Sequence, residues 1–185
     1  MELCVEGDLW DRAQRSPNGQ VQEQEALRLF CKMTRSLHYL HNNGIAHRDV
    51  SLKNVLLCNG VCKISDLGLA TDAERTCENE VVGKAYYMAP EVVTGQSYSP
   101  ILADMWPLGM TLFIMLTGSP LVHRAQEFDN DFYSFLKLGI RRVVCAWKMS
   151  SFISEEVCDL MSALLQRNPI DRLTTSDVFA HPLLQ

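Results

Sequence analysis

The sequence lacks an excess of basic residues, paired cysteines of the metal-binding kind and any long apolar run. Its 185 residues include 17 Lys plus Arg against 22 Asp plus Glu, which gives a formal net charge of −5. A chain of this charge has no basic footprint, so we expect no nucleic-acid partner. The seven cysteines are odd in number and include no C-x-x-C pair. This pattern disfavours disulfide frameworks and zinc knuckles and favours reduced thiols in the cytoplasm.

The N-terminus has no basic start and no apolar run, so no secretory signal is expected. The most apolar stretch, residues 108–116, is about half the roughly 20 residues that a membrane span needs. We therefore predict a buried helix there and no membrane span. Hydrophobic residues make up 47% of the chain and charged residues 21%, as in a globular domain with a sizeable core.

Apolar periodicity predicts a mainly α protein. Between residues 22 and 42 apolar side chains recur at three- and four-residue steps, and Asn43-Gly44 is a typical helix stop. Residues 68–87 are polar and irregular, which indicates a long loop, and nothing strand-like is convincing after residue 66. The helices predicted from these patterns are 8–16, 22–42, 101–117, 128–138, 154–166 and 174–180.

One hairpin is predicted, because Asn59-Gly60 separates two short apolar runs. In that register position 58 lies opposite 61 and position 54 opposite 65, so Asn54 lies close to Asp66. Mg²⁺ prefers oxygen ligands such as an amide oxygen and a carboxylate. Asp49, five residues before Asn54, is a further carboxylate that could accept a proton from an attacking hydroxyl. Metal ligands beside a base are typical of phosphoryl transfer.

The order of the motifs resembles a eukaryotic-type protein kinase of the serine/threonine branch. Residues 47–54 resemble the H-R-D-x-x-x-x-N catalytic loop, and Ala89-Pro90-Glu91 matches A-P-E. Asp66-Leu67-Gly68 resembles D-F-G with Leu in place of Phe. Residues 104–109 resemble D-x-W-S-x-G, and residues 167–172 resemble D-P-x-x-R. The resemblance implies a mainly α, kinase-like C-terminal lobe with one or two short β-hairpins. Residues 1–185 would form a partial kinase domain that starts at the hinge, has its activation segment at 66–91 and lacks the small N-terminal lobe.

The resemblance also implies roles for individual residues, with ATP and Mg²⁺ as cofactors and a protein as substrate. The catalytic base would be Asp49, and the Mg²⁺ ligands Asn54 and Asp66. The ATP-binding residues would be Glu2, Cys4, Asp8 and Leu56. The residues with structural roles would be His47, Arg48, Glu91, Asp104 and Arg172, of which Asp104 would brace the catalytic loop and Arg172 would pair with Glu91.

Two positions depart from the family pattern close to the base. Ser51 stands where serine/threonine kinases usually carry Lys, and Lys84 stands where they usually carry Thr. We expect the Lys84 ammonium to fill the space of the missing Lys and to reach the transferring phosphate, with Lys53 as the rival candidate. Pro107, where Ser or Ala is usual, would cost about 3 kcal/mol inside a helix and less near its first turn.

The activation segment carries an acid at an informative position. Counting back from Glu91, the residue that such kinases commonly phosphorylate falls on Glu80. A permanent carboxylate there could pair with Arg48 and order the loop without phosphorylation. The alternative is an exposed Glu on a solvated loop.

Three functions stay open on the sequence. The first is a protein kinase catalytic region that needs a small lobe, because residues 1–185 contain no glycine-rich loop and no strand Lys for the phosphates. The second is a pseudokinase-like scaffold, which Ser51, Lys84 and Pro107 favour. The third is a small-molecule phosphotransferase of kinase-like fold, which the A-P-E motif together with Arg172 disfavours.

Overall fold

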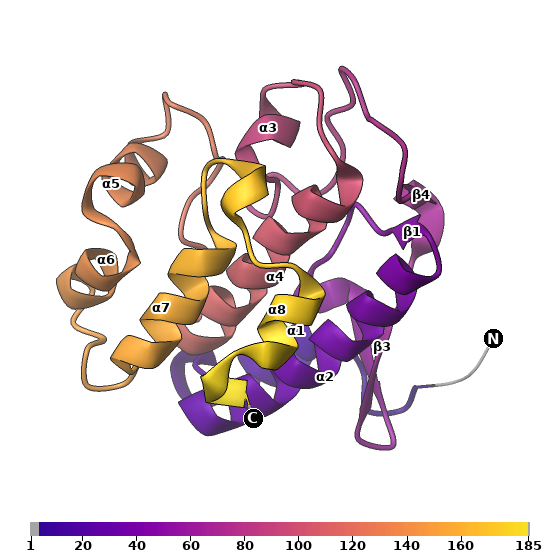
Figure 1. The fold of residues 1–185 in the computed structure, drawn as a ribbon. Coiled ribbons are helices and arrows are strands. Elements are labelled where there is room, and N and C mark those ends of the chain that lie inside the picture. Colours follow the sequence, from indigo (N-terminus) through magenta and orange to yellow (C-terminus); the bar gives the residue numbers. More distant parts are fainter. Residues whose placement is uncertain (1–3, 185) are drawn as a thin grey trace.

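A long apolar helix, α4 (Pro100–Thr117), runs through the middle of the protein (Figure 1). The computed structural model describes residues 4–184. Nearly every side chain of α4 is buried, as the prediction of a buried helix required. By length and composition α4 is apolar enough to cross a membrane, but 89% of it lies inside the fold, as in the core helix of many proteins.

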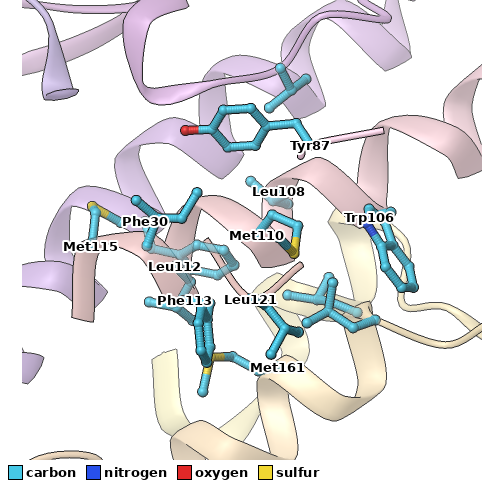
Figure 2. Packing of buried hydrophobic residues seen from close by; sticks show 14 of the residues in the cluster. Phe30, Tyr87, Trp106, Leu108, Met110, Leu112, Phe113, Met115, Leu121 and Met161 are labelled. Atoms are coloured by element: carbon cyan, nitrogen blue, oxygen red, sulfur yellow. The ribbon is translucent and has the colours of Figure 1, made fainter. Parts of the chain in front are cut away.

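Two other helices enclose α4. Helix α2 (Glu23–Asn42) buries its predicted apolar stripe, including Phe30, and α7 (Glu155–Leu164) packs on the other side. Figure 2 shows Phe30 and Met161 converging on Leu112 and Phe113 of α4. A side chain at Gly109 of α4 would place its Cβ 2.9 Å from the Cβ of Leu164, so only glycine allows α4 and α7 to approach this closely.

The helical content confirms the mainly α prediction, with two omissions. Helix α3 was not predicted because it is a single turn, and α6 because its seven residues follow directly after α5. The remaining helices are α1 (Leu9–Gln14), α3 (Pro90–Val93), α5 (Asn130–Leu138), α6 (Ile140–Ala146) and α8 (Thr175–Ala180). Short 3₁₀ turns lie at Pro17–Gly19, Leu52–Asn54, Leu67–Leu69, Pro169–Asp171 and Pro182–Leu184.

Two small antiparallel sheets complete the described fold. Strands β2 (Val55–Cys58) and β3 (Val61–Ile64) form the predicted hairpin, and Cys58 lies opposite Val61 as predicted. Strands β1 (Ile45–Ala46) and β4 (Thr71–Asp72) form the second sheet. The prediction of no strand after residue 66 was therefore wrong. These two-residue strands carry no alternation of their own, and they pair only because the fold brings distant segments together.

Candidate functional site

The loop at residues 47–54 is held from below by one buried carboxylate. Asp104, near the start of α4, accepts hydrogen bonds from the backbone N–H groups of His47 and Arg48, each at 2.7 Å. The Nε2 atom of His41 lies 3.0 Å from the same carboxylate. Arg48 has a φ of 64°, a left-handed conformation that is unusual for a residue with a side chain. The contacts of Asp104 hold this strained turn in place and thereby orient Asp49.

Asp49 carries one paired and one unpaired carboxylate oxygen. Its Oδ2 atom accepts from the amide nitrogen of Asn54 at 2.7 Å and from the ammonium of Lys84 at 2.6 Å. Its Oδ1 atom is buried and has no hydrogen-bond partner among residues 4–184. A cavity of about 20 Å³ lies beside it, lined in part by Gly83, Lys84 and Pro107, with room for one water-sized group. A buried oxygen without a partner is uncommon in folded proteins and calls for a functional explanation.

Lys84 and Lys53 have different surroundings. The Lys84 ammonium lies 3.2 Å from the hydroxyl of Ser51 as well as touching Asp49, so it occupies space next to the shorter side chain. Lys53 instead pairs with Asp11 at 2.8 Å and Asp8 at 3.4 Å, near the start of α1. The structure therefore brings Lys84 to Asp49 and directs Lys53 elsewhere.

The hairpin places the two expected metal ligands on adjacent strand ends. The N–H of Ser65 donates to the carbonyl of Asn54 at 2.8 Å, so Asp66 follows directly after the paired position. Asp66 is exposed, has a φ of 64° and accepts from the N–H of Gly68. Because the Asn54 amide nitrogen is bound to Asp49, its amide oxygen is the group left for a cation. One amide oxygen and one exposed carboxylate suit Mg²⁺, which takes few protein ligands together with phosphate oxygens.

Metal-ion sites built from protein side chains alone are not evident. Across residues 4–184 no cluster of three or more His, Cys, Asp or Glu could hold a metal ion. A cation between Asn54 and Asp66 would therefore need further ligands from a bound molecule, as phosphate groups would provide.

The expected ATP-binding residues lie along one edge, as far as they are described. Asp8 forms a β-bridge with Leu56, and the N–H of Leu57 donates to the carbonyl of Gly7 at 2.9 Å, so the segment before α1 runs beside β2. The Asp8 carboxylate caps α1 by accepting from the N–H of Asp11 at 2.7 Å. Cys4 is partly exposed at the same edge. Glu2 lies outside the described residues.

Glu80 joins the loop after β4 to the loop at 47–54. Its carboxylate pairs with Arg48 at 2.5 Å and also with Arg75. The hydrogen bond from Arg48 holds the pKa of Glu80 below its ordinary value. The hydroxyl of Tyr98 donates to the backbone carbonyl of Glu80, and burial raises the pKa of that phenol to about 12. The alternative of a free, solvated Glu80 is therefore not what the structure contains.

A buried ion pair fixes the end of the same segment. Arg172 donates two parallel hydrogen bonds to Glu91, at 2.6 and 2.7 Å, and its guanidinium lies 5.3 Å from the ring of Trp106. The Arg172 side chain is 0% exposed and that of Glu91 is 6% exposed. This bidentate pair attaches α3 to the turn that follows α7.

Sequence reasoning missed three contributors to this site. Arg75 shares the Glu80 carboxylate, Tyr98 supports its backbone, and the hydroxyl of Tyr87 lies 3.4 Å from the N–H of Leu52. Arg75 could have been found as the second basic residue within reach of Glu80 along the loop. The two tyrosines carried no such signal, because their contacts join segments far apart in the chain.

Comparison with known proteins agrees with this geometry. The family described as "Protein kinase domain" matches residues 1–184. The Xenopus tropicalis "Serine/threonine-protein kinase PLK4" is 34% identical over 188 residues, which cover 100% of this chain and 19% of the relative. The Drosophila grimshawi protein of the same name is 34% identical, with 100% and 23% covered. The rat "NUAK family SNF1-like kinase 2" is 33% identical over 183 residues, with 98% and 27% covered.

These matches extend over the whole chain but over only part of each relative. The chain spans about a fifth to a quarter of the length of the curated relatives it matches. The family match includes every segment that forms the site, from the edge before α1 to the Arg172 turn. The chain therefore belongs to the protein kinase domain family.

Proposed function

We propose that this chain carries the catalytic residues of a protein kinase that uses ATP and Mg²⁺ to phosphorylate serine or threonine in protein substrates. Residues 47–54 would be the catalytic loop and residues 66–91 the activation segment. The relatives named as serine/threonine-protein kinases support the substrate class. The observation that carries the proposal is the unpaired Oδ1 of Asp49, buried beside a cavity that can take a hydroxyl.

The proposed reaction transfers the terminal phosphoryl group. The bond between that phosphorus and the oxygen bridging it to the rest of ATP breaks, and a bond to the substrate hydroxyl oxygen forms. ADP leaves, and the hydroxyl proton passes to Asp49. Asn54 and Asp66 would hold Mg²⁺ against the phosphates. Lys84, paired with Asp49, would place a positive charge beside the transferring group, the position that the small side chain of Ser51 leaves open.

Turnover in this proposal needs a lobe that covers the phosphates. Residues 1–185 contain no glycine-rich loop and no strand Lys of that kind. Positioning of this sort supplies several kcal/mol of a barrier, so we propose that the residues described here act together with such a lobe. A cytoplasmic location is part of the same proposal, and seven free cysteines support it.

Mg-ATP binding gives the first test. A ligand at about ten times its Kd stabilises the folded state by about 1.4 kcal/mol, which raises Tm by about 3–6 °C in a chain of this size. We expect this rise with Mg-ATP, and we expect EDTA or Asp66→Asn to remove most of it. Asp131→Asn is the matched control, because Asp131 is exposed in α5 and makes no printed side-chain contact. An equal rise in all variants, or none with Mg-ATP, would contradict the proposal.

Phosphotransfer by the chain joined to a small lobe gives the second test. We expect Asp49→Asn to lower kcat by about 10²–10⁴-fold, the usual contribution of a general base. Lys84→Met should lower kcat by up to about 10²-fold if its ammonium stabilises the transferring charge. The measurement is incorporation of labelled phosphate into dephosphorylated casein.

A second candidate function rests on the same ion pair. Lys84 neutralises Asp49 at 2.6 Å, and a base that is already paired suits a scaffold without turnover. This alternative predicts no Tm rise with Mg-ATP and no casein phosphorylation. A gain of activity in Lys84→Met would show that the pair inhibits transfer.

A further inference from the structure

Helix α2 presents a row of basic side chains to solvent. Arg28, Lys32 and Arg35 are all exposed and lie at four- and three-residue steps, so they share one face of the helix. We call these three residues the α2 basic row. This face is opposite in sign to the chain as a whole, whose formal net charge is −5.

The charges of the α2 basic row are not neutralised by acidic neighbours. Among residues 4–184, neither Arg28 nor Arg35 forms an ion pair or a side-chain hydrogen bond, and Lys32 donates only to the carbonyl of Gly60, at 2.7 Å. Most other arginines of the described chain do have acidic partners, as Arg141 has in Asp159 and Glu155. Three cations without acidic partners make this face a local site of positive potential.

Two hollows flank the α2 basic row, and no acidic residue lines either of them. One, of about 570 Å³, lies between α2 and the β2–β3 hairpin, and the other, of about 390 Å³, lies between α2 and the C-terminal segment. Figure 1 shows α2 with β3 on one side and the C-terminal end on the other. Both hollows contain apolar side chains: Tyr39, Leu40, Val61 and Ile64 in the first, and Leu27, Leu183 and Leu184 in the second.

From this arrangement we infer that the face of α2 is a docking surface for an acidic segment of a partner protein that also carries apolar side chains. The carboxylates would pair with the α2 basic row, and the apolar side chains would enter the hollows beside Tyr39, which is 69% exposed, and Leu184. Charge complementarity and apolar burial would then act together, as in other peptide-binding grooves.

A folded groove favours a peptide over other anionic partners. A bilayer surface cannot enter hollows on both sides of a helix, and a polynucleotide needs more phosphate contacts than three cations provide while the rest of the chain repels it. The inference does not depend on phosphotransfer, since no residue of the α2 basic row lies in the site around Asp49.

Peptide binding to the full chain tests the inference. The probe is a fluorescein-labelled peptide of about a dozen residues in which pairs of Glu alternate with single Leu, and anisotropy reports binding. One comparison peptide has Lys for Glu, and another has Gly for Leu. The variant is Arg28→Glu with Arg35→Glu. The matched control is Arg142→Glu with Lys148→Glu, which makes the same charge change at two exposed residues near α6 that form no ion pair within residues 4–184.

The expected result is weaker binding of the Glu-Leu peptide to the α2 variant by about tenfold or more, since each reversal replaces an attraction by a repulsion. The control variant should bind within about twofold of the unchanged chain, and both comparison peptides should bind more weakly. Circular dichroism checks folding, and Arg28→Gln with Arg35→Gln replaces the first variant if that variant is unfolded.

Three results would overturn the inference. The control variant could lose as much affinity as the α2 variant, which would show a general charge effect. The Lys-Leu peptide could bind as tightly as the Glu-Leu peptide. Phosphatidylserine vesicles could bind the chain while the Glu-Leu peptide does not, which would make the face a membrane contact.

Discussion

Removal of the buried guanidinium of Arg172 should be far more costly than removal of an exposed one. Arg172→Met leaves the Glu91 carboxylate, which is 6% exposed, without its partner. Breaking a buried pair from one side costs about 3–5 kcal/mol, because the remaining charge is desolvated and unpaired. In a chain of this size that corresponds to a fall in Tm of about 6–20 °C.

The matched control is Arg141→Met. Arg141 also holds two parallel contacts to a carboxylate, Asp159, but the two side chains are 49% and 58% exposed. Exposed pairs contribute at most about 1 kcal/mol, so Tm should fall by no more than about 4 °C. The two variants remove the same chemical group from the same pairing geometry and differ mainly in burial.

Urea unfolding followed by tryptophan fluorescence measures both variants. Trp106 is buried and lies 5.3 Å from the Arg172 guanidinium, so it reports on the local structure. The double variant Glu91→Gln with Arg172→Met should be more stable than Arg172→Met alone, since no buried charge is left unpaired. Equal costs for Arg172→Met and Arg141→Met, or a double variant less stable than the single one, would refute the reasoning.

Three further predictions concern the loops and the core. Pro107→Ala should raise the free energy of unfolding by about 1–2 kcal/mol, since Pro107 is the eighth residue of α4, where it removes a hydrogen bond at a cost of about 3 kcal/mol, and the lost ring offsets part of the gain; urea unfolding would show a loss instead if the ring is required. The lowered pKa of Glu80 means that its contribution to loop order is present above its ordinary pKa near 4.5 and disappears as the pH falls through the folded-state value; limited proteolysis after Arg75 should therefore accelerate on acidification with a pH-tolerant protease, and Glu80→Ala should remove that dependence. Among the cysteines, exposed Cys145 should react with a thiol reagent at neutral pH well before Cys62, whose pKa burial raises to about 11; equal rates would contradict the burial of Cys62.

Local patterns allowed much of the fold to be predicted. The apolar stripe of α2 and the all-round apolarity of α4 are properties of neighbouring residues, and so is the Asn59-Gly60 turn that sets the register of β2 and β3. The order of the motifs also predicted an ion pair between Arg172 and Glu91, and the structure contains that pair. These features depend on residues whose relation is fixed by spacing or by family resemblance.

Only the tertiary structure decided which of several nearby groups meet. Both Lys53 and Lys84 were candidates to reach Asp49; Lys84 does so, while Lys53 pairs with Asp11 because α1 lies against the turn that carries Lys53. The β1–β4 pairing, the unpaired Oδ1 of Asp49 and the hollows beside the α2 basic row likewise depend on segments that are distant in the chain. Periodicity is recorded in adjacent residues, whereas such meetings are set by the packing of whole helices around α4, which no local pattern encodes.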